Sequence, residues 1–255
     1  MPENFFSTFM TITKPFLILQ LRPEDSTSDN EFQAFLKYGG LDEKDVCRIR
    51  IEKTGIPELS LDDYSAVIVG GSPFDISTPE NQKSTIQKKI ENDFKRLLDD
   101  IVANDFPFLG ACSGCGLLGS YLNTPISGKY AEAVGGVEIK LTQKGKNDAL
   151  LSGFPDAITV LLGHKEACDV TPDTATLLLR GQACPVQMFR IGKNIYATQF
   201  HPEGDCEGFT LRIHTYKNHG YFKPEEAEQL IEAVSQKDTP YAQEILKRFV
   251  NRYAR

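Results

Sequence analysis

The cysteine at position 112 lies in a sequence that could make it a nucleophile. Glycines flank it at both second neighbours, in the segment Gly-Ala-Cys-Ser-Gly at 110–114. Small residues at these positions let a strand turn sharply into a helix, and such a turn exposes the side chain at its tip. The positive end of the helix dipole would favour the thiolate there. We therefore predict that Cys112 is a nucleophile on a strand-to-helix elbow.

A cysteine nucleophile needs a base, and the sequence has only four histidines. His201 follows a strand-like run at 195–199, and Glu203 comes two residues later, beyond Pro202. Because proline fixes the local backbone, the imidazole and the carboxylate could be held beside each other. The carboxylate would orient the ring and stabilise imidazolium, while the other ring nitrogen faces the thiol. The predicted catalytic residues are Cys112, His201 and Glu203.

The same chemistry needs N–H donors for the oxygen of a substrate carbonyl. The backbone N–H of Ser113, directly after the nucleophile, would supply one donor. The loop Gly70, Gly71 and Ser72 follows a strand-like run and would supply the other, because ligands gather at the carboxyl ends of strands in open α/β sheets. His164 either lines the same pocket or is a hydrogen-bonded histidine at a strand end.

The elements that must position these residues follow from the pattern of the chain. Short apolar runs bounded by turn residues alternate with longer amphipathic stretches, which predicts an α/β protein with a mostly parallel sheet and helices on its faces. Strands are expected at 16–21, 46–51, 66–69, 106–111, 137–141, 158–162, 176–179, 186–191 and 195–199. The last two, joined by Gly-Lys-Asn, predict a hairpin and an antiparallel edge.

Helices are expected between the strands and after them. They fall at 30–38 with a stop at Gly39-Gly40, from near Pro79 to Ile101, after Cys112, and beyond Phe222 with a start at 224–226. No repeat, linker or shift of composition marks a second domain. We therefore predict one domain over 1–255, with a core at about 15–220 and a C-terminal helical extension at about 221–255.

Composition and charge argue against several classes of protein. The chain is 40% hydrophobic and 25% charged, which is ordinary globular usage. Its net charge of -7 gives no general footprint for nucleic acid or an anionic membrane. No apolar run approaches the roughly 20 residues that span a bilayer, and the stretch 4–13 lacks the basic start of a signal peptide. We expect a cytoplasmic protein.

The six cysteines are too sparse for a disulfide framework, so reduced thiols are expected. Cys112 and Cys115 also form a C-x-x-C, which is typical of a thioredoxin-like redox pair. That alternative leaves His201 and Glu203 without a role, and no second C-x-x-C exists to complete a zinc site. We expect Cys115 to be a packing residue and the protein to need no metal or cofactor.

Three segments together resemble a known family. The segment 110–114, the sequence Gln-Phe-His-Pro-Glu at 199–203 and Val-Gly-Gly-Ser at 69–72 are similar to those of the class I glutamine amidotransferases. The likeness spans roughly 16–203, and the nearest subgroup is the stand-alone proteins similar to the amidotransferase half of GMP synthase. The resemblance implies a flavodoxin-like sheet, a Cys-His-Glu triad, a γ-glutamyl thioester and release of ammonia, with oxyanion N–H groups from Gly71 and Ser113.

The sequence departs from the family pattern at two places. Gly116 stands where the family usually has a glutamine that helps to hold the substrate, and the stretch at 164–166 reads His-Lys-Glu. Thiol hydrolysis is expected to survive these changes better than specificity for glutamine does.

Three hypotheses for the function follow. The first is hydrolysis of glutamine, with ammonia delivered to a partner synthase, since the chain has no P-loop of its own. The second is a stand-alone γ-glutamyl peptidase or amidase that acts on a modified substrate. The third is a catalytically silent, binding member of the fold. The sequence leaves open the physiological substrate, the partner and whether the C-terminal helices form a homodimer contact.

Overall fold

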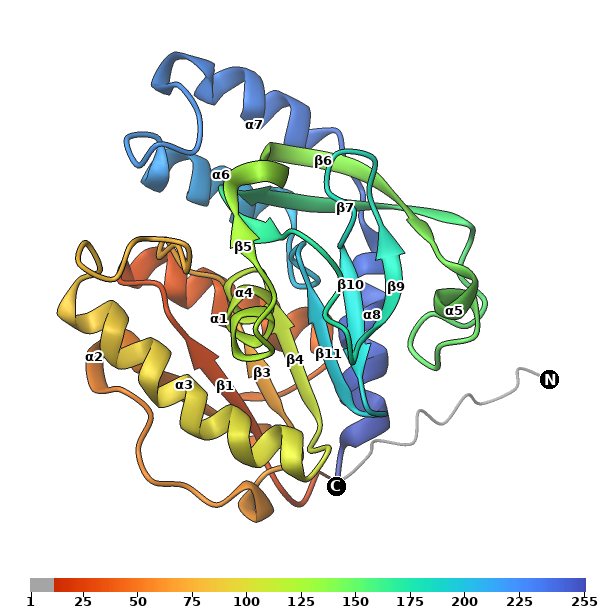
Figure 1. The fold of residues 1–255 in the computed structure, drawn as a ribbon. Helices are drawn as coiled ribbons and strands as arrows, with labels where there is room; N and C mark the ends of the chain where they lie inside the picture. The colour runs from red at the N-terminus through yellow and green to blue at the C-terminus, as the bar shows by residue number, and fades with distance from the viewer. Residues whose placement is uncertain (1–11) are drawn as a thin grey trace.

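The computed structural model describes residues 12–255, so most of the stretch 4–13 lies outside the described part. Its centre is a nine-stranded sheet in the order β2-β1-β3-β4-β11-β10-β9-β6-β7 (Figure 1). The strands are β1 (Phe16–Gln20), β2 (Val46–Arg50), β3 (Val67–Val69), β4 (Phe108–Ala111), β6 (Glu132–Leu141), β7 (Ala157–His164), β9 (Thr176–Arg180), β10 (Met188–Ile191) and β11 (Ile195–Thr198). A separate pair joins β5 (Ile126–Ser127) and β8 (Ala167–Cys168).

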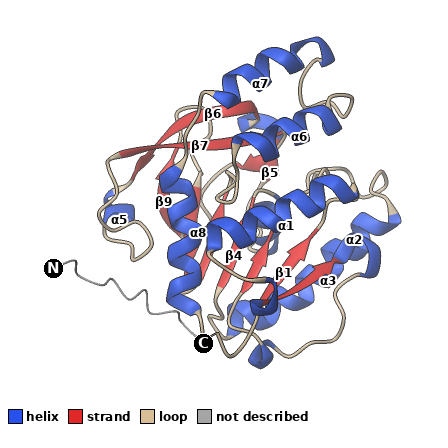
Figure 2. Cartoon of the chain, turned by 180° about the vertical axis from the view of Figure 1, so that it is seen from behind, coloured by secondary structure: helices blue, strands red, loops and turns tan. Residues whose placement is uncertain are grey.

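Helices cover both faces of this sheet, as predicted. They are α1 (Asp25–Gly39), α2 (Ile51–Thr54), α3 (Thr85–Ala103), α4 (Ser113–Tyr121), α5 (Gln143–Lys146), α6 (Cys206–Tyr216), α7 (Ala227–Ser235) and α8 (Pro240–Tyr253). Figure 2 shows α1 and α8 in front of one face, with α3 behind the other. Phe35 of α1 and Phe249 of α8 are fully buried on the first side, and Phe94 of α3 and Leu118 of α4 lie in the core on the second.

The sheet has a parallel part and an antiparallel part. The strands β2, β1, β3, β4 and β11 run parallel, and the remaining pairs of the sheet are antiparallel. The predicted hairpin β10–β11 is present, but the antiparallel edge is formed by β6 and β7, because β11 pairs with β4. In that pairing Thr198 lies opposite Ala111. The ends of these two strands therefore bring the segments around 112 and 201 together.

Several elements differ from the sequence prediction in extent. Helix α1 begins at Asp25 rather than near 30, and α3 begins at Thr85 rather than near Pro79. The start of α3 is set by Ser84, whose hydroxyl accepts a hydrogen bond from the backbone N–H of Gln87 at 3.2 Å. Strand β6 extends back to Glu132 through a register shift, whereas the strand was expected only from 137.

The C-terminal part is helical, as predicted. Helix α7 packs on α6 and β6, while α8 packs against α1 and β7. Helix α6 had not been predicted; it begins after Asp205, whose carboxylate accepts from the N–H of Gly208 at 2.8 Å. A glycine in the first turn weakens the helical signal in the sequence.

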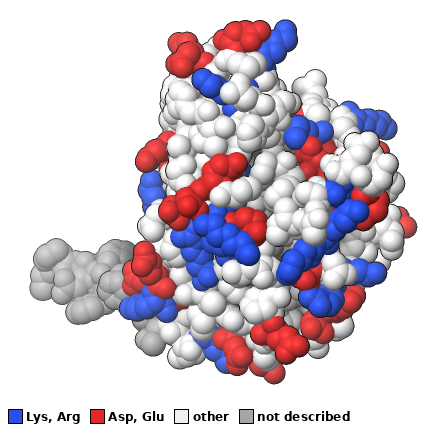
Figure 3. Space-filling model, turned by 90° about the vertical axis from the view of Figure 1, so that its left-hand side faces the viewer, with Lys and Arg blue, Asp and Glu red and all other residues white. Residues whose placement is uncertain are grey.

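Charged side chains of both signs lie on the surface of the molecule. The face in Figure 3 carries acidic and basic side chains interspersed, without a field of one sign. Within residues 12–255, no helix has the length and apolar character that a membrane crossing requires.

Candidate active site

Cys112 lies at the tip of a sharp turn between β4 and α4. Its backbone N–H donates to Thr198 O at 2.8 Å, and its dihedral angles are φ 50° and ψ −97°. A non-glycine residue in such a region costs about 1–3 kcal/mol, a strain that concentrates at functional sites. A Cβ on Gly110 would lie 2.7 Å from the backbone of Gly114, and one on Gly114 would lie 3.1 Å from Val69 Cβ. The flanking glycines are therefore required by close approach of the backbone.

His201 and Glu203 form a buried pair beside this turn. His201 Nδ1 lies 2.7 Å from Glu203 Oε1, and the two residues are 4% and 0% exposed. Because the carboxylate accepts, Nδ1 carries the ring proton and Nε2 keeps its lone pair. His201 lines the same cavity as Cys112. The structure thus brings together the three residues that the sequence predicted for catalysis.

The surroundings set the charge of each member of the site. Burial raises the pKa of the Cys112 thiol to about 11, against the opposing effect of the nearby arginines, Arg22 and Arg212. Burial also lowers the pKa of His201 below its ordinary value, although Glu203 opposes this. The resting pair is therefore a neutral thiol and a neutral imidazole. Desolvation disfavours the thiolate that the helix dipole would favour, and with a neutral thiol the proton has to leave as the sulfur attacks.

Glu203 remains ionised in this setting. Burial alone would raise the pKa of its carboxyl, but His201 and the Arg212 guanidinium hold it well below its usual range. Arg212 Nη2 donates to Glu203 Oε1 at 2.9 Å. The carboxylate can therefore stabilise a positive charge on the imidazole.

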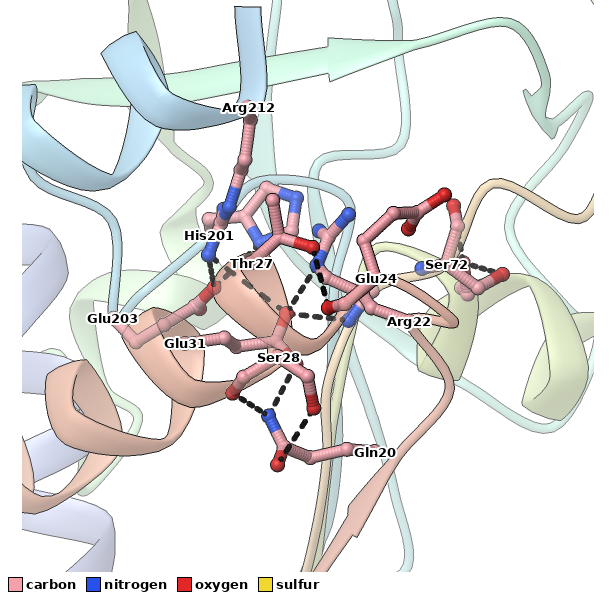
Figure 4. A network of polar contacts seen from close by, with 12 residues as sticks. Gln20, Arg22, Glu24, Thr27, Ser28, Glu31, Ser72, His201, Glu203 and Arg212 are labelled. Atoms are coloured by element: carbon pink, nitrogen blue, oxygen red, sulfur yellow. Dashed lines mark hydrogen bonds and ion pairs between the residues drawn. The ribbon is translucent and has the colours of Figure 1, made fainter. Parts of the chain in front are cut away.

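A second buried carboxylate, Glu31 of α1, lies behind the catalytic residues. It is 0% exposed and accepts from Arg22 Nε at 2.8 Å, while Arg212 Nη2 lies 3.7 Å away. Figure 4 shows these side chains as one chain of contacts from Arg22 to His201. Sequence reasoning missed Arg22, Glu31 and Arg212, because each lies outside the recognised motifs.

The loop 70–72 lies beside His201, one of the candidate catalytic residues. A Cβ on Gly71 would come within 2.7 Å of His201 Cε1. All three backbone N–H groups of this loop have acceptors: Gly70 donates to Leu19 O, Gly71 to Glu31 Oε1 at 3.2 Å, and Ser72 to Ser113 Oγ at 2.8 Å. Within residues 12–255, the N–H of Ser113 has no acceptor.

His164 meets both of its predicted descriptions. It is the last residue of β7, and its Nδ1 lies 3.0 Å from Glu166 O while its Nε2 lies 3.0 Å from Glu132 Oε2. It also lines a cavity that contains Cys112. Since each ring nitrogen already contacts a protein oxygen, neither is free for a contact with Cys112.

Cys112 lies between two cavities, which share Ser72, Cys112, Gly163 and Tyr221 as lining residues. The first cavity has a volume of about 40 Å³ and is partly open to solvent; its other lining residues are Arg22, Val134, His201, Phe209, Arg212, Ile213, Tyr216 and Phe222. The second has a volume of about 30 Å³ and is also lined by Phe74, Asp75, Ser113, Gly116, Ile126, His164, Lys165, Glu166 and Gln199. The first is mainly apolar and aromatic, and the second is lined by polar and apolar surface in equal parts.

The two departures from the family pattern lie together in the second cavity. The Glu166 carboxylate accepts from the backbone N–H groups of Ile76 at 2.6 Å and Ser77 at 2.8 Å. A Cβ on Gly116 would lie 3.3 Å from Ile76 Cγ1 and 3.9 Å from Glu166 Oε1. The loop that Glu166 holds therefore lies against position 116, where a longer side chain would meet it.

Two clusters offer donor sets that a metal ion could use. They are Glu132, His164 and Cys184, and Glu31, His201 and Glu203, each with its ligand atoms within 4.8 Å of one another. Both already contain an imidazole–carboxylate contact. The two cysteines of the C-x-x-C, Cys112 and Cys115, are both free thiols, and Cys115 packs in the core, as expected.

Comparison with known proteins agrees with this geometry. The family model "Glutamine amidotransferase class-I" matches residues 25–213. The glutamine amidotransferase-like protein YfeJ of Salmonella typhimurium is 26% identical over 57% of this chain and 59% of its own length. A glutamine-hydrolysing GMP synthase subunit of Methanosphaera stadtmanae is 28% identical over 41% of this chain and 55% of its own length. The chain thus spans little more than half the length of these curated relatives.

Solved structures share the whole fold. A glutamine amidotransferase from Thermotoga maritima superposes with a TM-score of 0.74 at 21% identity, covering 94% of this chain and 98% of that one. A protein from Thermoplasma acidophilum described as a GMP synthase subunit gives a TM-score of 0.63 at 19% identity, with 95% and 94% covered. The matched segment contains the elbow, the loop 70–72 and the His–Glu pair. The chain belongs to the class I glutamine amidotransferase family.

Proposed function

We propose that the protein hydrolyses a γ-glutamyl amide through a thioester on Cys112. The observation that supports this most directly is the shared cavity, which is lined by a thiol and by a histidine whose Nδ1 is held by Glu203. The lone pair of Nε2 remains available to the thiol. This is the arrangement that activates a cysteine nucleophile at an amide carbonyl.

The steps follow from the charges of the resting site. His201 Nε2 takes the thiol proton as sulfur bonds to the amide carbon, and Glu203 stabilises the imidazolium. The carbon–nitrogen bond then breaks, and the same proton passes to the leaving nitrogen. Water, deprotonated by His201, attacks the thioester, and the acid and the Cys112 thiol are released.

The oxygen of the substrate carbonyl would be stabilised by backbone donors. Ser113 N–H needs no rearrangement for this role, since it has no acceptor within residues 12–255. Gly71 N–H could join it only after turning away from Glu31. Donors placed where the negative charge develops contribute several kcal/mol to such reactions.

The second cavity suits the γ-glutamyl group. Lys165 Nζ and Asp75 Oδ2 form an ion pair at 2.6 Å, and both side chains are partly exposed. A carboxylate and an ammonium at this place complement the α-ammonium and α-carboxylate of a glutamyl substrate. Glutamine is the default amide. Delivery of its ammonia to a partner synthase is supported by the relatives named as subunits of GMP synthase.

One observation favours a second candidate, a stand-alone γ-glutamyl peptidase or amidase. Gly116 and Glu166 depart from the family pattern together, and the loop at 76–77 lies against position 116. Because these two residues change the contacts that the second cavity offers, the site is suited to a substrate whose acyl group or amide makes other contacts than glutamine does.

Ammonia and glutamate release from glutamine, measured on the purified chain, tests the proposed function. Cys112→Ala should abolish the release, while Cys47→Ala, a matched change on the edge strand β2, should leave it unchanged. Hydrolysis that persists in Cys112→Ala would show that the sulfur is not the nucleophile.

A further inference from the structure

The leaving group of the proposed reaction must lie in the first cavity. Its nitrogen has to accept a proton from His201, so it must come within hydrogen-bond reach of Nε2. His201 lines the first cavity and does not line the second. The acyl group and the leaving group therefore occupy opposite sides of Cys112.

The walls of the first cavity are unsuited to ammonia alone. Val134, Phe209, Ile213, Tyr216 and Phe222 present apolar surface to it. Ammonia has no apolar part that such a wall could bind. An apolar side chain on the leaving group would gain about 25 cal/mol for each Å² of surface removed from water.

One polar side chain in this cavity, Arg212, is incompletely hydrogen-bonded. It is 7% exposed, and its Nη2 donates to Glu203. Its Nε and Nη1 are buried and have no acceptor within residues 12–255. Unmet donors of a buried charged group are costly, and a carboxylate is the natural acceptor for a guanidinium. Because Nε and Nη1 are closed to solvent, a ligand carboxylate would complete the hydrogen bonds of Arg212 after a turn of the guanidinium toward the cavity.

We infer that the substrate is a γ-glutamyl dipeptide whose second residue has an apolar side chain. This rests on the proposed hydrolysis at Cys112. The apolar side chain packs on the wall formed by Val134 and Phe222, and the carboxylate of the second residue meets Arg212. Attack by Cys112 breaks the γ-amide bond and releases a free amino acid that takes its proton from His201. Hydrolysis of the thioester then yields glutamate, so one water is consumed for each dipeptide.

Hydrolysis of γ-glutamyl-phenylalanine, γ-glutamyl-glycine, γ-glutamyl-phenethylamide and glutamine by the purified chain tests this inference. The phenylalanine dipeptide should exceed the glycine dipeptide and glutamine in kcat/KM by about 10-fold or more, as expected for an apolar pocket. The phenethylamide, which lacks only the carboxylate, should fall about 10-fold below the phenylalanine dipeptide. Amine release in the first turnover is recorded as well, so that a slow second step does not mask cleavage.

A matched pair of variants locates the effect. Val134→Thr keeps the shape of the wall and adds a hydroxyl, and it should reduce the preference for phenylalanine over glycine several-fold. Val170→Thr makes the same change at a position that is 54% exposed, and it should leave the preference unchanged. If the Val134→Thr enzyme kept its full preference for the phenylalanine dipeptide over the glycine dipeptide, the first cavity would not be the source of that preference.

The outcomes separate this inference from the proposed function. Glutamine hydrolysed at least as well as the phenylalanine dipeptide would overturn the inference and leave hydrolysis at Cys112 intact. Cleavage of none of the four amides, with no adduct on Cys112 from a glutamine-analogue chloroketone, would overturn both.

Discussion

The protein contains two buried imidazole–carboxylate pairs that are alike in composition and differ in what they can do. His201 and Glu203 meet at 2.7 Å, and His164 and Glu132 meet at 3.0 Å. In the first pair the Glu203 carboxylate contacts Nδ1 of His201, so Nε2 remains without a carboxylate partner. His201 lines the same cavity as the Cys112 thiol. In the second, Glu132 takes Nε2 and the carbonyl of Glu166 takes Nδ1. A histidine beside a glutamate is therefore not enough; the base is the one that keeps a ring nitrogen for the reaction.

Removal of the available ring nitrogen should have the largest effect. His201→Ala is expected to lower kcat/KM for a γ-glutamyl amide by about 10⁴-fold, because the imidazole that takes the thiol proton is lost. Steady-state kinetics measures this, and thermal unfolding checks that the fold is kept. If kcat/KM of His201→Ala fell by less than 10-fold, His201 would not be the base. The free ring nitrogen would then not explain a functional difference between the two histidine–glutamate pairs.

The carboxylate behind the first pair should matter chiefly for stability. Glu31→Gln leaves Arg22 without its buried anion and should lower the free energy of unfolding by about 3 kcal/mol in urea denaturation. Asp29→Asn removes the exposed partner of Arg48 and should cost less than about 1 kcal/mol. Equal costs for the two changes would contradict the buried network as a source of stability.

The second pair should prove structural. His164→Gln removes contacts to Glu132 and Glu166 and is expected to cost about 1–2 kcal/mol of stability. Its kcat should change by less than 10-fold, because the ring has no nitrogen to offer the reaction. A loss of 100-fold in kcat at unchanged KM would give His164 a catalytic role and end the contrast.

The pH dependence should report the neutral state of the resting site. His201 acts as a base only when unprotonated, and its pKa is lowered from 6.5. Activity is therefore lost as the pH falls through a value below 6.5 and stays level above it, since the pKa of the thiol is about 11. The profile of kcat/KM against pH measures this. An acid limb centred above 6.5 would indicate a thiolate–imidazolium pair instead.

Local sequence was enough to predict Cys112, His201 and Glu203 as the candidate catalytic residues and to find most of the strands. The elbow at 110–114 and the segment 199–203 could be recognised because each is a short motif next to an apolar strand. The pairing of β4 with β11, which brings the two segments together, was not predicted, because the hairpin that ends in β11 was expected at the edge of the sheet.

The residues that shape the site were not predictable in the same way. Glu31 and Arg212 lie on helices, and a charged residue on an amphipathic helix ordinarily faces solvent. Helix α6 itself was missed, so the position of Arg212 could not be foreseen. The division of the site into two cavities depends on loops from distant parts of the chain, such as the one that places Tyr221 between them.

The central claim is that Cys112 is a nucleophile activated by His201, and covalent labelling tests it most directly. A glutamine-analogue chloroketone is incubated with the protein and the product is read by intact mass and peptide mapping. One adduct on Cys112, absent from Cys112→Ala and formed much more slowly by His201→Ala, is the predicted result. No adduct, or labelling spread equally over the half-buried thiols of Cys47 and Cys206, would contradict it.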